Sequence, residues 1–177
     1  MPNHVMNKIT FKTIYAPFVL AKIWRKGYFD FNSLIKSPAN VYQGDLAKQD
    51  DEDFKTNWST WNRANWGTKW NSYDCEIKLG LRETSIIFQT AWSVPYPIIT
   101  AFANVFRMNF THKYVCEYGE FWGIEKWSTI DRFDKKNTIC RRIEKVRDTP
   151  ELMKPLLLEL RNYDPDKEED AIPEITS

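Results

Sequence analysis

The segment DCEIKLGLRETSIIFQTAW, residues 74–92, carries the clearest strand pattern in the chain. Apolar residues alternate with polar or small ones on both sides of the short Arg82-Glu83 connection. Alternation with a period of two is typical of strands that bury one face, and a short connection favours antiparallel pairing. The segment therefore predicts an antiparallel β-hairpin at the centre of the fold.

Three further patterns precede this hairpin. Residues 5–13 alternate as a half-buried strand, and residues 17–27 carry apolar pairs at i,i+4 spacing that indicate a helix ended by its glycine. Residues 29–35 alternate again, which predicts a second strand. The polar run and the tryptophan-rich stretch that follow predict a helical insertion over residues 38–73.

Tryptophans are concentrated in this insertion. Phe54, Trp58 and Trp61 follow i, i+4, i+7 spacing, which is typical of the buried stripe of a helix. Trp66 falls off that stripe, and Gly67 is expected to end the helix. We therefore expect the helix to bury the first two tryptophans of the cluster.

The patterns after the hairpin alternate between helix and strand. Residues 95–106 start with two prolines and predict a helix, and residues 112–118 and 121–127 alternate as strands. A second pair of strands is expected to flank the polar turn 134–137, and residues 149–160 predict a short helix. This order of elements predicts an α+β sandwich, with helices covering one face of a mostly antiparallel sheet.

Three short strings carry a family resemblance. They are WGTKWN at residues 66–71, FQTAWS at residues 88–93 and MPN at residues 1–3. Together they resemble the YubB-type ferredoxin-like domain proteins carried by plasmids and phages, a family without an established biochemical role. The resemblance covers residues 1–127 and implies a ferredoxin-like fold.

Length and charge suggest a single domain with a tail. The chain has 177 residues, which fits one domain over residues 1–163, where residues 128–163 add a hairpin and a short helix. Residues 164–177 hold six acidic side chains and one lysine, so we expect a disordered acidic tail. By contrast, residues 126–147 hold eight basic side chains against three acidic ones. The tail is therefore expected to screen this basic stretch.

Composition argues against several classes of protein. The three cysteines are widely separated and the two histidines lie in no ligand motif, so we expect free thiols, no metal and no cofactor. No apolar stretch is long enough to span a membrane and the start does not read as a secretory signal, so a cytoplasmic location is expected. No catalytic motif is present, which leaves an enzyme unsupported.

Two groups of residues are candidates for binding. Indole faces attract cations and stack on planar ligands, and Trp92 lies where a strand leads into a helix whose backbone N–H groups could hold an anion. The alternatives are a packing motif for the tryptophan string, a rigid turn at Trp92 and a solvated face for the basic residues. The candidates are Trp66, Thr68, Lys69, Trp70, Asn71 and Trp92 in the aromatic group, and Arg132, Lys135, Lys136, Arg141 and Arg142 in the basic group.

Three hypotheses of function follow. The first is a non-enzymatic interaction protein of a mobile genetic element, which binds a host or defence-system protein and thereby inhibits host immunity. The second is a nucleic-acid or nucleotide binder that stacks bases on the tryptophans and holds phosphates with the basic stretch. The third is an enzyme with its site around residues 66–71.

Overall fold

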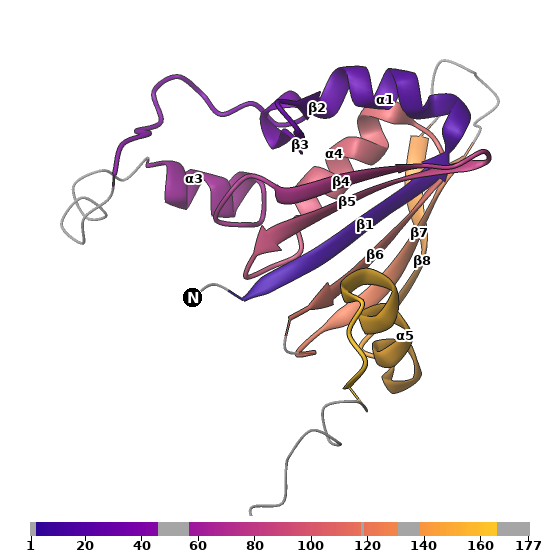
Figure 1. Ribbon diagram of the computed structural model, residues 1–177. Coiled ribbons are helices and arrows are strands. Elements are labelled where there is room, and N and C mark those ends of the chain that lie inside the picture. The colour runs from indigo at the N-terminus through magenta and orange to yellow at the C-terminus, as the bar shows by residue number, and fades with distance from the viewer. Residues whose placement is uncertain (1–2, 46–56, 118, 131–138, 166–177) are drawn as a thin grey trace, which may run out of the picture.

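A computed structural model describes residues 3–45, 57–117, 119–130 and 139–165 (Figure 1). The predicted turn 134–137 and nearly all of the predicted tail lie outside the described residues. The described elements are β1 (His4–Lys12), η1 (Thr13–Tyr15), α1 (Ala16–Ile23), β2 (Trp24–Arg25), β3 (Tyr28–Phe29), η2 (Phe31–Ser33), α3 (Trp58–Asn65), β4 (Tyr73–Leu79), β5 (Glu83–Ala91), α4 (Tyr96–Phe106), β6 (Phe110–Cys116), β7 (Trp122–Ile130), β8 (Ile139–Arg147) and α5 (Pro150–Arg161).

Six of the described strands form one antiparallel sheet in the order β4-β5-β1-β6-β7-β8. β1 lies between β5 and β6, and its register pairs Ile9 with Ile86 on one side and with His112 on the other. The hairpin predicted over residues 74–92 forms β4 and β5, and the strand predicted over residues 112–118 forms β6. The strand predicted over residues 121–127 and the first strand of the later pair are one strand, β7, which pairs with β8. The predicted α+β fold with an antiparallel sheet is therefore confirmed.

The main core lies between the sheet and the helices α1 and α4, which are on the same side of it (Figure 1). Phe29, Phe31, Phe88 and Phe102 have no exposed surface. Their rings pack edge to face, with centroids 5.1 Å apart between Phe29 and Phe88 and 6.0 Å apart between Phe31 and Phe88. Full burial of each such ring contributes roughly 1.5–3 kcal/mol, so this aromatic cluster holds α4 and the β2–β3 segment onto the sheet.

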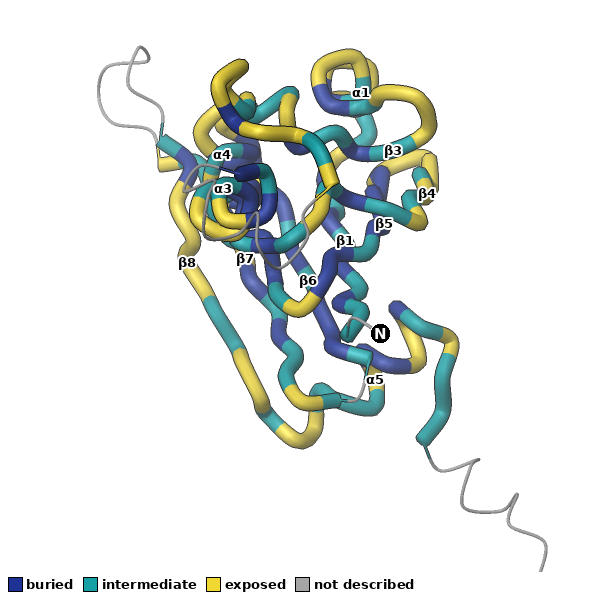
Figure 2. The backbone as a smooth tube through the Cα atoms, turned by 90° about the vertical axis from the view of Figure 1, so that its left-hand side faces the viewer, coloured by how far each residue is buried: buried dark blue, intermediate teal, exposed yellow. Residues whose placement is uncertain are grey.

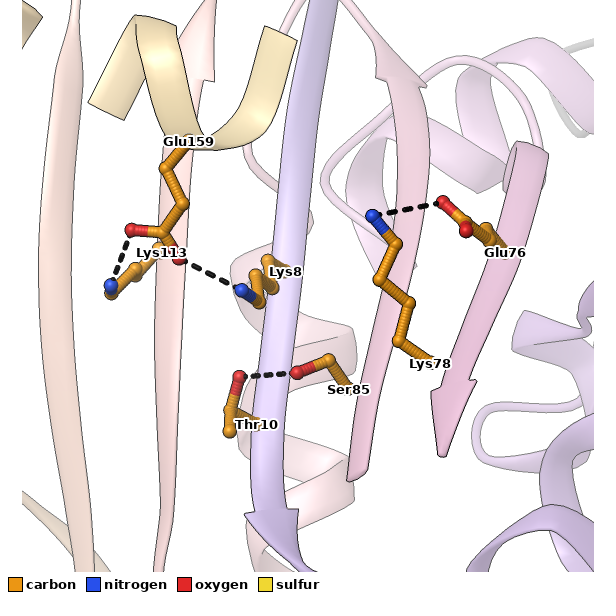
Figure 3. Close-up of polar contacts among 7 residues, drawn as sticks. All are labelled: Lys8, Thr10, Glu76, Lys78, Ser85, Lys113 and Glu159. Carbon is orange, nitrogen blue, oxygen red and sulfur yellow. Dashed lines mark hydrogen bonds and ion pairs between the residues drawn. The ribbon is translucent and has the colours of Figure 1, made fainter. Parts of the chain in front are cut away.

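The opposite face of the sheet is covered in part by α5 (Figure 1). Leu156 and Leu160 of α5 pack with Val115 of β6, and Glu159 accepts hydrogen bonds from Lys8 at 2.8 Å and Lys113 at 2.6 Å (Figure 3). The rest of this face carries polar pairs, such as Thr10–Ser85 and Glu76–Lys78 (Figure 3). A helix on this second face is a finding that the sequence patterns did not predict.

The segment after α1 differs from its prediction. Helix α1 ends at Ile23, before Gly27, because the chain turns into the two-residue strands β2 and β3. Lys26 and Gly27 form their turn with φ of 49° and 88°, a pair of positive values that favours a tight hairpin over a helix. Asp30 then accepts a hydrogen bond from Asn32 N at 3.1 Å, which starts a 3-10 turn where a second strand was predicted.

Helix α3 also buries a different face from the predicted one. Ser59 and Asn62 are buried, whereas Trp58 and Trp61 are only half-buried at the sides of the helix. Asn62 faces inward because its side-chain amide donates to Lys69 O at 2.9 Å, across the turn that follows the helix. The predicted stripe also included Phe54, which lies outside the described residues.

Candidate functional site

The tryptophan-rich string 66–71 begins with the turn that ends α3. Gly67 has φ of +77°, and a Cβ at this position would lie 2.8 Å from Cδ of Pro97. A side chain is disfavoured at this φ and would also collide with Pro97. Glycine therefore ends α3, as predicted, and lets the turn pass close to the start of α4.

Trp66 is a core residue. Its side chain is 4% exposed, and its indole N–H donates to Ile35 O at 2.9 Å. Its ring packs edge to face against Phe31 and Trp61, with centroids 5.8 and 5.5 Å away. Because these contacts use most of its surface, Trp66 has little area left on which a ligand could stack.

Thr68 and Asn71 fasten the string to the sheet and to the β2–β3 segment. The Thr68 hydroxyl is buried and donates to Ala91 O at 2.8 Å. The Asn71 side chain accepts from Phe31 N at 2.9 Å and donates to Asp30 Oδ1 at 2.8 Å. Both side chains therefore make hydrogen bonds within the protein that hold this turn in place.

Lys69 and Trp70 lie on the outside of the same turn. Nζ of Lys69 lies 6.0 Å from the ring centroid of Trp58 and 5.5 Å from that of Trp70. Trp70 is 37% exposed. Of the candidates predicted in the string 66–71, these two remain accessible. The neighbouring rings hold the cation of Lys69 by cation–π contacts.

The turn brings Gly67 to a cleft beside Trp92. This cleft, called the Trp92 cleft below, has a volume of about 320 Å³ and lies where β5 leads into α4, next to the β6–β7 turn and the end of β8. Three aromatic rings and one guanidinium contribute to its walls. The lining residues are Gly67, Trp92, Ser93, Val94, Tyr96, Pro97, Phe121 and Arg147.

The backbone of Trp92 is in an unusual conformation for so large a residue. Its φ is 72°, and its N–H donates to Asn3 O at 2.8 Å. A residue with a side chain in the left-handed region costs roughly 1–2 kcal/mol relative to its ordinary conformation. The strain occurs where the half-exposed indole enters the cleft, a combination typical of positions with a binding role.

A pair of substitutions at this position tests the strain. We expect Trp92→Gly to be more stable to unfolding than Trp92→Ala by about 1 kcal/mol, because both remove the indole and only glycine adopts this φ freely. Urea denaturation gives the difference. Gln89, an inner residue of the preceding strand β5, provides the control pair, at which glycine is expected to be less stable than alanine. If the glycine variant is less stable than the alanine variant at both positions, the backbone of Trp92 is not strained.

A buried polar network connects strands β1, β6, β7 and β8. His112 and Glu125 have no exposed surface, and His112 Nδ1 lies 3.5 Å from Glu125 Oε2. His112 Nε2 donates to Asn7 Oδ1 at 3.1 Å, and Glu125 Oε1 accepts from Arg142 at 2.9 Å and faces Lys145 at 3.3 Å. The carboxylate therefore joins the middle of the sheet to its edge strand β8.

The network shifts the pKa of both buried groups. Burial raises the pKa of Glu125, but His112, Arg142 and Lys145 together outweigh burial and lower this pKa to about 2. Burial lowers the pKa of His112, and Glu125 offsets only part of that effect. Arg142 and Lys145 therefore act together with His112 to keep Glu125 ionised.

Much of the predicted basic stretch is neutralised within the sheet. Arg142 is bonded to Glu125 and lies 5.9 Å from the ring centroid of Trp127, and Lys126 pairs with Glu144 at 2.7 Å. Arg141 is exposed on the edge strand β8, which Figure 2 shows to be mostly exposed. The other predicted basic candidates, Arg132, Lys135 and Lys136, lie outside the described residues.

An exposed apolar surface lies at the opposite end of β5. Ile14, Phe18, Leu79 and Leu81, called the apolar tip below, are 81%, 65%, 69% and 102% exposed. The β1–α1 connection joins the β4–β5 turn there, because Thr13 N donates to Arg82 O at 2.9 Å. Ile14 and Leu81 also line a common groove of about 460 Å³.

The thiols do not contribute a reactive site. All three cysteines are free, as their spacing predicts. Cys116 and Cys140 are buried, and burial raises the pKa of Cys140 to about 11, so its thiolate is scarce at neutral pH. Among the described residues, no group of three or more His, Cys, Asp or Glu side chains is placed to hold a metal ion.

Several residues of these surfaces were not candidates from the sequence. Tyr96, Phe121 and Arg147 reach the Trp92 cleft from three separate elements, so no local pattern joins them. The apolar tip had a visible signal, because the alternation of the hairpin continues to Leu79 and Leu81. That signal indicates burial, and only the structure shows that both side chains are exposed.

Comparison with known proteins supports the fold and assigns no activity. The family model described as the ferredoxin-like domain in Api92-like protein matches residues 65–139, from the end of α3 to the first residue of β8. No curated protein and no solved structure gives a match. None of the described helices is long and apolar enough to cross a membrane. Residues 65–139 thus carry a ferredoxin-like domain similar to the one in Api92-like protein.

Proposed function

We propose that this chain is a non-catalytic interaction protein that binds another protein through the apolar tip. The observation that carries the proposal is that Ile14 and Leu81, which are 81% and 102% exposed, line one groove at the end of the sheet. Leu79 and Phe18, 69% and 65% exposed, lie close to them along the chain. Single exposed apolar residues are common on protein surfaces, whereas adjoining ones mark interaction sites. Binding that covers this surface would remove apolar area from water, which is the main driving force of association.

The charges around the apolar tip indicate the chemistry of the partner. Lys12 and Arg82 line the groove with Ile14 and Leu81, and only Glu83 opposes them. Lys78, next to Leu79 in β4, is 60% exposed but pairs with Glu76 at 3.5 Å, so Lys12 and Arg82 supply the excess positive charge. The partner that fits is therefore a protein segment with apolar side chains flanked by acidic ones, since opposite charges at the rim favour and orient the encounter.

We also propose a biological setting for this binding, a mobile genetic element in its host cell. The three sequence strings that resemble plasmid- and phage-encoded proteins support a mobile genetic element as the source and the host cytoplasm as the location. The partner would then be a host protein, such as a component of a defence system that the chain inhibits. This setting rests on the resemblance, whereas the binding surface rests on the exposed side chains.

A pull-down with matched variants tests the binding surface. Tagged wild-type chain, Leu81→Asp and Leu158→Asp would each be incubated with host-cell lysate, one half treated with nuclease and one half untreated, and bound proteins identified by mass spectrometry. We expect a stoichiometric protein to be retained by the wild type and reduced at least about tenfold by Leu81→Asp, because a charge in an apolar interface is costly to desolvate. Leu81 is fully exposed, so the fold is unaffected.

Leu158 is the control because it is an apolar residue, 42% exposed, on α5 at the second face of the sheet. Leu158→Asp is expected to retain the partner as the wild type does. Equal retention by both variants, or loss only in Leu158→Asp, would show that the apolar tip is not the interface. Capture that disappears on nuclease treatment would favour a nucleic acid instead.

A further inference from the structure

The Trp92 cleft has the walls of a site for a planar ring. Trp92 is 51% exposed, and Tyr96 and Phe121 line the same cleft. Tyr96 is held in position, since its hydroxyl donates to Tyr114 Oη at 3.0 Å and their rings pack edge to face at 6.1 Å. Rings fixed before a ligand arrives lose little conformational freedom on binding, so they make efficient stacking surfaces.

The cleft also favours negative charge. Arg147 reaches it from the end of β8, and Nζ of Lys145, on the same strand, lies 4.4 Å from the ring centroid of Tyr96. Lys145 is paired with Glu125 at 3.3 Å, whereas Arg147 is exposed and interacts with the hydroxyls of Tyr96 and Tyr114 and with the neighbouring Asp148. A guanidinium presents several N–H donors in a planar fork that matches the oxygens of a phosphate.

We propose that the Trp92 cleft binds a nucleotide, with the base stacked on Trp92 and the phosphate held by Arg147. The volume of about 320 Å³ lies at the lower end of the range for small-molecule sites, which is roughly 300–1,000 Å³. The start of α4 at Tyr96 adds the positive end of a helix dipole on the same side as Arg147. The strained backbone of Trp92 is then the cost of presenting its indole to the base.

Two kinds of ligand carry a base and a phosphate in this way: a free nucleotide and the terminal nucleotide of a single strand. Isothermal titration of the full chain with adenosine 5′-monophosphate and with a short deoxyadenosine strand separates them. If the monophosphate and the strand bind with equal affinity, the free nucleotide is the ligand. If the strand binds much more tightly, the ligand is the terminal nucleotide of a strand. In either case, adenosine without its phosphate is expected to bind more weakly than the monophosphate.

Two variants with matched controls test the site. Trp92→Leu is expected to weaken binding roughly 5- to 150-fold, the range found for loss of a stacked base. Arg147→Gln is expected to weaken binding and to lower the salt dependence for the strand by about one unit of slope. Trp70→Leu and Arg141→Gln remove the same side chains from exposed positions outside the cleft and are expected to leave binding unchanged.

Several results would overturn the proposal. These are no heat of binding from any of the three probes at millimolar concentration, or equal weakening by the cleft variants and by their controls. Unchanged thermal midpoints would show that each variant remains folded. The apolar tip lies at the other end of β5, so failure of this test leaves the protein-binding proposal intact, and Leu81→Asp is expected to bind nucleotide like the wild type.

Discussion

Glu125→Gln is expected to lower the free energy of unfolding by about 1–3 kcal/mol, the cost of losing the charge-assisted hydrogen bonds of a buried carboxylate. Glu125 has no exposed surface and accepts a hydrogen bond from Arg142 at 2.9 Å, with Lys145 at 3.3 Å. Glutamine has nearly the same shape but no charge, so Arg142 and Lys145, whose side chains are 39% and 22% exposed, would lose their negative partner. Urea denaturation of the full chain measures the change.

Glu144→Gln is the control for this prediction. Glu144 also pairs with a lysine across β7 and β8, at 2.7 Å from Lys126, but both side chains are about half exposed. An exposed pair contributes roughly 0–1 kcal/mol, so this variant is expected to change stability little. Similar losses in the two variants would show that burial of Glu125 is not the source of the effect.

Acid is expected to destabilise the protein through the same carboxylate. The pKa of Glu125 is about 2 in the folded chain against an ordinary value of 4.5, so the unfolded state binds a proton in this window and the folded state does not. Stability from Glu125 is therefore fully present above pH 4.5 and is lost as pH falls toward 2, at about 1.4 kcal/mol per pH unit. The pKa of His112 is also lowered, so its contribution to stability likewise decreases as pH falls below 6.5.

Unfolding curves measured from pH 7 down to pH 2 in the wild type and in Glu125→Gln check this expectation. Other carboxylates titrate in both proteins, so the contribution of Glu125 is the difference between the two curves. We expect the gap between the wild type and the variant to narrow as pH falls from 4.5 to 2. A gap that stays constant over this window would mean that Glu125 has an ordinary pKa.

The sequence predicted elements well where local periodicity agrees with tertiary burial. The hairpin over residues 74–92, the first strand and α4 follow directly from alternation or from apolar pairs next to a proline. The segment 24–35 was misread because positive φ values at Lys26 and Gly27 and a side-chain cap from Asp30 decide its path. Turn geometry of this kind produces no periodic pattern in the sequence, and it overrides an apolar–polar alternation that is only a few residues long.

Surfaces were harder to predict than elements. Trp66 looked like a binding residue because it lies in one short string with Lys69 and Trp70, yet its indole is buried in the core. Arg147 and Phe121 meet Trp92 only because β7 and β8 extend the sheet beyond β6. Sites assembled from several elements depend on strand order, which the composition of a single segment does not contain.

The most direct test of the proposed function is photo-crosslinking in the host cell. A benzophenone amino acid would replace Leu81 in one version of the chain and Leu158 in another, two exposed positions on different surfaces. We expect position 81 to crosslink to one host protein in high yield and position 158 not to crosslink to it. A partner crosslinked from position 158 alone, or no crosslink from position 81, would contradict the assignment of the apolar tip as the interface.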